Sequence, residues 1–101
     1  MQRFLIDKKD KLDSLCKTYN VKDLYAFGSV CTDKFRETSD IDFLVSFKHM
    51  RPDDYADSYF DLADKLEELF HRPVDLVTEK SLKNPYFIES LNQTKTRLYG
   101  A

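Results

Sequence analysis

The stretch Ala26–Ser29 (AFGS), followed after ten residues by Asp40–Val45 (DIDFLV), decides the fold. It places a Gly-Ser pair at the end of one short apolar run and opens the next apolar run with two carboxylates. Because side chains alternate between the two faces of a strand, Asp40 and Asp42 are predicted to project together. The apolar residues between and after them, Ile41, Phe43 and Val45, are then predicted to pack on the opposite face.

Two carboxylates held side by side repel each other, and a divalent cation relieves that repulsion. At the other end of the stretch, Gly28 lets the backbone approach a ligand closely, and a helix that begins there would direct free N–H groups at a phosphate. Metal and phosphate together indicate nucleotide chemistry.

Length and composition favour one small domain over residues 1–101, with 42% hydrophobic residues and only 2 glycines. The 16 basic and 18 acidic residues give a net charge of -2, which predicts no general attraction to nucleic acid. A nucleic-acid role would need a local basic patch, which the sequence does not reveal. No apolar run approaches the roughly 20 residues that span a bilayer. Cys16 and Cys31 make no disulfide framework, so we expect a cytoplasmic protein with reduced thiols.

Hydrophobic periodicity predicts helices and strands in alternation. Asn20 is expected to end the first helix, Asp53 or Asp54 to cap the second, and Asn84 to cap the third. The order indicates an α/β (α+β) fold, a small mixed β-sheet of three to four strands flanked by helices. The expected helices cover 3–19, 53–71 and 85–91, the expected strands cover 24–27, 40–47, 74–78 and 96–99, and 30–39 is a polar segment with room for a helical turn.

Asp75 lies inside an apolar strand, where a lone buried carboxylate costs several kcal/mol. Either it lies on a solvent-facing edge or a positive group compensates it, and a metal already held by Asp40 and Asp42 would do so. Three carboxylates facing one cleft would form a site for one or two Mg²⁺ ions, completed by water and substrate phosphate oxygens.

The Gly28-Ser29 pair, ten residues, and then Asp40-Ile41-Asp42 resembles the signature of the DNA polymerase beta-like nucleotidyltransferase superfamily. The compact length and Pro73–Val77 after one helix resemble its minimal nucleotidyltransferase (MNT) branch, whose members are commonly antitoxins paired with HEPN-domain toxins. The resemblance implies a polymerase beta-like nucleotidyltransferase fold and an Mg²⁺-dependent enzyme. Such an enzyme would transfer a nucleoside monophosphate, AMP from ATP, to a hydroxyl of a HEPN-domain partner. Both homo- and hetero-oligomers fit this description.

The resemblance also implies roles for individual residues. Gly28 and Ser29 would bind the triphosphate through backbone N–H groups and the hydroxyl. Asp40 and Asp42 would hold the metals that bridge the phosphates. Asp75 would be the third catalytic carboxylate, coordinating the metal and helping to deprotonate the acceptor hydroxyl.

The sequence departs from the family pattern at one place. Many relatives carry an Arg-Gly pair shortly after the Gly-Ser, where this chain has Cys31-Thr32-Asp33. Lys34 or Arg36 would have to supply the missing positive charge. Two alternative functions follow: a catalytically weak or inactive antitoxin that acts by direct binding, and the catalytic subunit of a small-molecule nucleotidyltransferase. The simpler structural roles are a helix cap for Ser29 and a turn residue for Asp40.

Overall fold

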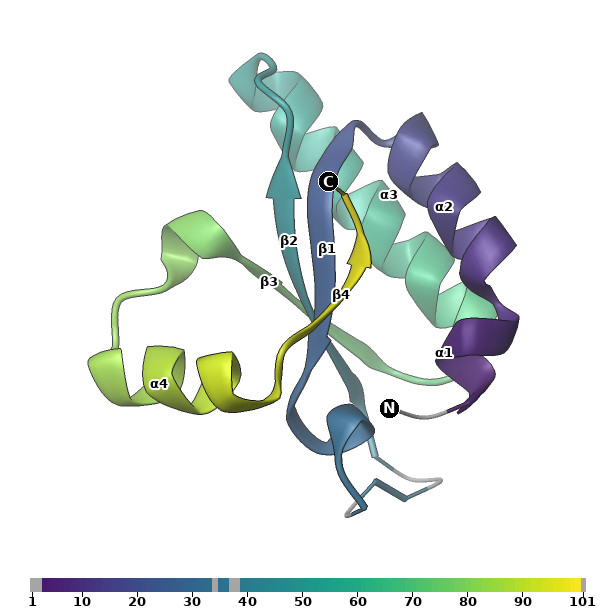
Figure 1. Cartoon of the computed structure of the whole chain (residues 1–101). Coiled ribbons are helices and arrows are strands. Elements are labelled where there is room, and N and C mark those ends of the chain that lie inside the picture. The colour runs from purple at the N-terminus through teal and green to yellow at the C-terminus, as the bar shows by residue number, and fades with distance from the viewer. Residues whose placement is uncertain (1–2, 34, 37–38, 101) are drawn as a thin grey trace.

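The computed structural model describes residues 3–33, 35–36 and 39–100. A sheet lies at the centre with helices on both of its faces (Figure 1). In chain order the elements are α1 (Arg3–Asp7), α2 (Lys9–Thr18), β1 (Val21–Phe27), the 3₁₀ turn η1 (Gly28–Cys31), β2 (Ile41–Phe47), α3 (Pro52–Phe70), β3 (Val74–Thr78), the 3₁₀ turn η2 (Glu79–Ser81), α4 (Pro85–Thr94) and β4 (Thr96–Tyr99).

The sheet is mixed and has four strands in the order β3-β2-β1-β4. Strand β1 pairs antiparallel with both β2 and β4, whereas β2 and β3 are parallel. Parallel neighbours need a crossover connection, and α3 supplies it between β2 and β3. The small mixed sheet flanked by helices confirms the predicted fold class.

The two faces of the sheet carry cores of different size. Helices α1, α2 and α3 cover one face, and α4 lies on the other (Figure 1). On the α4 face a small cluster joins Phe27, Leu44 and Leu91. The larger core, on the other face, includes the buried residues Leu12, Leu24, Ala26, Ile41, Phe43, Val45, Leu62, Leu66 and Leu76.

Helix ends follow the local sequence in most places. Asn20 has a φ of 60°, the left-handed conformation predicted to end the first helix. The side chain of Asn84 accepts hydrogen bonds from the backbone N–H groups of Tyr86 and Phe87 at 2.9 and 3.4 Å, as expected of an N-cap before Pro85.

Two helix predictions were wrong in detail. The helix expected over 3–19 is interrupted at Lys8, whose ψ of 12° lies outside the helical range. The second helix begins at Pro52, so its N-cap position is Arg51, two or three residues before the predicted Asp53 or Asp54, and no side chain caps it. Proline suits the first helical position because it has no N–H to satisfy. Asp53 and Asp54 then lie in the first turn, where their negative charges interact favourably with the positive end of the helix dipole.

Within the described residues, no helix is both long and apolar enough to cross a membrane.

Candidate active site

The register of the central strands brings two of the predicted carboxylates together. Asp42 of β2 is paired with Asp75 of the parallel strand β3, and on its other side with Phe27 at the end of β1. Residues in register on neighbouring strands point to the same face. Since Ile41 and Phe43 are buried in the larger core, Asp42 and Asp75 lie on the α4 face of the sheet.

Asp42 is the carboxylate whose ionisation the structure disfavours most clearly. Burial, the charge of Asp75 and the charge of Asp40, in that order, raise its pKa from 3.8 to about 6. The two other predicted site residues are therefore the charges that act on it. A cation beside Asp42 would offset the neighbouring negative charges and lower the pKa of Asp42 toward its ordinary value.

The other two carboxylates are exposed. Asp75 lies on the edge strand β3 in contact with solvent, which is the first of the two explanations that its sequence context left open. Asp40 precedes β2 by one residue, so it belongs to the loop and not to the strand predicted over 40–47. Its position therefore depends on how the segment before β2 is held.

The donor atoms of this group are carboxylate oxygens, the ligands that Mg²⁺ prefers, and Mg²⁺ keeps several waters and phosphate oxygens among its six ligands. As the side chains lie, no three acidic, histidine or cysteine residues of the described ranges close into a metal cluster. Asp42 and Asp75 in register, with Asp40 near, fit an open site for Mg²⁺ rather than a closed cage.

Gly28 lies against Asp42, in a conformation and a space that favour glycine. Its φ is +75°, and a Cβ built on it would lie 2.6 Å from Oδ2 of Asp42. The backbone can therefore turn sharply after β1 and pass beside the carboxylate only because Gly28 has no side chain. The close approach brings the Gly-Ser pair and the Asp-x-Asp motif of the sequence together in the fold.

The turn after Gly28 is shorter than the helix that the sequence suggested. It is a single 3₁₀ turn, Gly28–Cys31, closed by a hydrogen bond from Thr32 N–H to the Ser29 carbonyl at 3.0 Å. The Gly28 N–H donates to Oγ1 of Thr94 at 2.9 Å, so the end of α4 already uses this donor. Within the described part of the chain, the Ser29 hydroxyl has no hydrogen-bond partner and stays available.

Sequence reasoning did not identify Thr94, because the predicted helix stopped at Leu91. The periodic apolar residues end there, and only the tertiary structure brings the following turn of α4 against η1.

Arg36, one of the two residues considered for a positive charge near the phosphates, is held within its own loop. Arg36 donates through Nη1 to the carbonyls of Asp33 and Phe35, at 3.2 and 3.3 Å, within its own loop. Lys34, the other residue considered for this role, lies outside the described residues.

Arg72 is a second residue that sequence reasoning did not single out. Its guanidinium lies over the rings of Phe35 and Phe4, with 4.7 and 5.1 Å to the two ring centroids. The two rings are stacked on each other, 5.6 Å apart. Cation–π contacts of this kind contribute about 0.5–1 kcal/mol each at a partly exposed site.

The same guanidinium also holds the loop that leads into Asp40. Nη1 of Arg72 donates to the carbonyls of Arg36 and Ser39, both at 3.3 Å. Ser39 immediately precedes Asp40, so Arg72 fixes the backbone from which that carboxylate projects. A planar guanidinium can stack on the rings and donate from Nη1 at the same time, which a lysine ammonium would not do.

Comparison with known proteins identifies the family to which the sequence and fold are similar. Residues 8–97 match the family model described as the nucleotidyltransferase domain. A candidate protein adenylyltransferase of Methanocaldococcus jannaschii, MJ0128, is 39% identical over 79 residues, which is 78% of each chain.

Solved structures with a similar fold include further nucleotidyltransferases. A candidate minimal nucleotidyltransferase superposes with a TM-score of 0.76 at 30% identity, covering 93% of this chain and 92% of that one. The MNT antitoxin fold recurs in a complex with a tri-AMPylated Shewanella oneidensis HEPN toxin, with a TM-score of 0.66, 21% identity and coverage of 96% and 73%. The match over most of the sequence, and the fold and carboxylates that accompany it, place this chain in the nucleotidyltransferase domain family, in its minimal branch.

Proposed function

We propose that this chain is an Mg²⁺-dependent protein adenylyltransferase that transfers AMP from ATP to a tyrosine hydroxyl of a HEPN-domain partner, as the antitoxin of a toxin-antitoxin pair. The observation that carries the proposal is the register of Asp42 with Asp75 beside the Gly28 turn. The likeness to a candidate protein adenylyltransferase supports the protein acceptor.

Each residue of the site has a separate role in the proposed reaction. Bound Mg²⁺ would supply neutralisation of the phosphate charges. Asp42 and Asp40 would hold it, and the free Ser29 hydroxyl would donate to a phosphate oxygen. Asp75, exposed at the sheet edge, would accept the proton of the acceptor hydroxyl while the hydroxyl oxygen forms its bond to the α-phosphorus. The bond to the β-phosphate oxygen then breaks, and pyrophosphate leaves. Positioning would account for most of the rate.

One observation favours a second function, in which the chain neutralises its partner by binding alone. Arg36 bonds its own loop, so within the described residues this loop directs no cation at the phosphates. Without such a cation, the charge that develops on the phosphates is less well stabilised. A catalytically weak antitoxin would have this arrangement.

Label transfer from α-³²P-ATP separates the two functions. In the presence of Mg²⁺ and a HEPN-domain protein encoded beside this chain, we expect label on a tyrosine of the partner. Removal of the metal with EDTA should reduce labelling to background, and added Mg²⁺ should restore it. If no nucleotide or divalent metal yields label, yet the toxin is still suppressed, the binding function is correct.

A substitution at Arg72 tests how the Asp40 loop is held. Arg72→Ala is expected to lower the transfer rate about tenfold and to raise the Mg²⁺ concentration needed for half-maximal rate, because Asp40 is no longer held in place. Arg72→Lys should restore only part of this loss, since it keeps the charge but not the planar guanidinium that stacks on the two rings. Arg51→Ala, at an exposed arginine before α3, is the matched control. An unchanged Mg²⁺ dependence in Arg72→Ala would contradict the assignment.

A further inference from the structure

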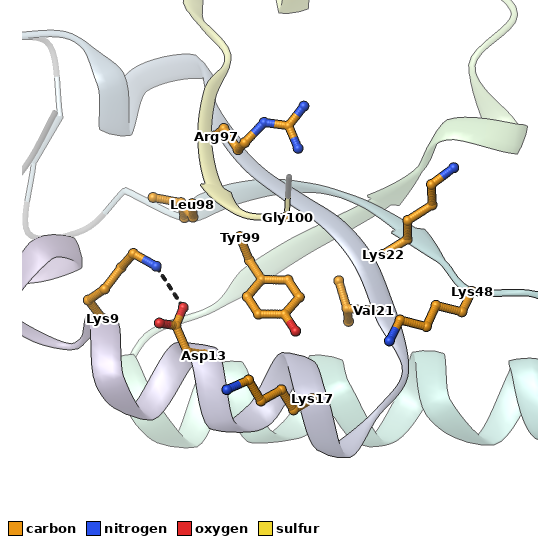
Figure 2. Close-up of a pocket in the computed structure, with 10 residues that line it drawn as sticks. All are labelled: Lys9, Asp13, Lys17, Val21, Lys22, Lys48, Arg97, Leu98, Tyr99 and Gly100. Carbon is orange, nitrogen blue, oxygen red and sulfur yellow. Dashed lines mark hydrogen bonds and ion pairs between the residues drawn. The ribbon is translucent and has the colours of Figure 1, made fainter.

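A pocket of about 570 Å³ opens at the end of the sheet opposite the carboxylates (Figure 2). Val21, the first residue of β1, lines it, whereas Phe27, the last residue of β1, lies beside Asp42. At about 3.3 Å per residue, the two places are roughly 20 Å apart. The pocket is lined by Lys9, Asp13, Lys17, Val21, Lys22, Lys48, Arg97, Leu98, Tyr99 and Gly100.

The lining is strongly basic, although the chain as a whole has a net charge of -2. Two of its cations have carboxylate partners: Lys9 lies 2.7 Å from Asp13, and Arg97 pairs with Asp23. Within the described residues, none of the other three lysines forms an ion pair. These uncompensated lysines are Lys17, Lys22 and Lys48.

These lysines come from α2, β1 and the segment after β2, so only the folded chain brings them to one cavity. Like charges at one cavity repel one another, and a multiply charged anion converts that repulsion into attraction. Tyr99 adds a hydroxyl that has no hydrogen-bond partner among the described residues. In Figure 2 the ammonium groups of Lys17 and Lys48 extend on either side of that hydroxyl.

We propose that this pocket binds phosphate groups, supplied either by a free polyphosphate or by the backbone of a nucleic acid. Lysine acts as a compact point charge, which suits phosphate oxygens. A polyphosphate or phosphodiester chain carries about one charge or more per phosphate, so it matches a pocket whose lining carries several cations. An acidic peptide would need several carboxylates converging on the same small space. The pocket is also the local basic patch that composition alone could not reveal.

Binding of inorganic triphosphate and of a fluorescein-labelled decauridine RNA tests the proposal. Both titrations are made at low salt in EDTA, so that metal-dependent binding at the carboxylate end is absent. The wild-type chain should bind at least one probe, with affinity that falls as salt rises. Lys17→Glu/Lys48→Glu should weaken binding about tenfold or more. Tighter binding of RNA would identify a nucleic-acid backbone as the source, and tighter binding of triphosphate a free polyphosphate.

Two further variants keep the result decisive. Glutamate near the end of α2 opposes the helix dipole, so Lys17→Gln/Lys48→Gln provides a milder pair, expected to weaken binding severalfold with an unchanged melting curve. Lys11→Glu/Lys83→Glu changes two exposed lysines outside the pocket and should leave affinity within about twofold. The proposal is overturned if the wild type binds neither probe, if this control pair weakens binding equally, or if poly-glutamate binds as well as the phosphates.

Discussion

Asp42→Asn is expected to lower the rate of AMP transfer at least about 10³-fold, because the site loses the carboxylate that its neighbours make most receptive to a cation. The measurement is label transfer to the partner at saturating ATP and Mg²⁺. Asn has nearly the same shape as Asp, so the fold and the partner interface should be retained. Asp64→Asn, at an exposed aspartate of α3, is the matched control and should transfer at the wild-type rate.

The same substitution should make the metal-free protein more stable. Asp42 has a pKa of about 6 in the folded chain and 3.8 ordinarily, so the folded state holds its proton more tightly. Stability of the wild type is therefore lost as pH rises from about 4 to 6, and the loss is constant above that range. After allowance for solvent around a half-buried group, the expected loss is about 1 kcal/mol.

Urea unfolding at pH 4 and pH 7 checks this sign. The stability difference between Asp42→Asn and wild type should be near zero at pH 4 and about 1 kcal/mol in favour of the variant at pH 7. Added Mg²⁺ should stabilise the wild type at pH 7 and leave the variant nearly unchanged. A variant less stable than wild type at both pH values would show that Asp42 is a structural residue.

Gly28→Ala is expected to destabilise the protein by about 2–3 kcal/mol and to abolish transfer. Part of the loss is conformational, because a φ of +75° is unfavourable for any residue with a Cβ. The rest is steric, since the new Cβ would lie 2.6 Å from Oδ2 of Asp42 and would push the carboxylate out of place. Equilibrium unfolding and label transfer measure the two consequences.

A double-mutant cycle separates the two parts. In an Asp42→Ala background the steric contact is absent, so Gly28→Ala should cost only about 1 kcal/mol there. If Gly28→Ala costs the same in both backgrounds, the close approach of Gly28 to Asp42 makes no energetic contribution and only the backbone conformation matters.

Much of this fold could be predicted from local patterns. Alternation placed Ile41, Phe43 and Val45 in the core and Asp42 on the opposite face, because successive side chains of a strand point in opposite directions. Asn20 and Asn84 marked helix ends because their side chains favour left-handed and capping conformations. The N-cap of α3 was predicted two or three residues too late, because Pro52 occupies the first helical position and Asp53 and Asp54 lie in the first turn.

The candidate site was predictable as a set of residues but not as a geometry. Gly28, Ser29, Asp40, Asp42 and Asp75 were chosen from spacing and family resemblance. Their roles as ligands remain predictions. That Asp75 is exposed, that the Gly28 N–H already binds Thr94, and that Arg36 bonds its own loop are properties of the folded chain.

The sequence by itself determined the order of the helices and strands and the face on which Asp42 lies, because these depend on sterics and hydrophobic alternation over a few neighbouring residues. The tertiary structure alone decided which distant residues meet. Asp42 faces Asp75 across a parallel register, Arg72 stacks on Phe4 and Phe35, and three lysines from separate elements share one cavity. Such contacts join residues tens of positions apart, and packing of the whole chain selects them, which no local pattern records.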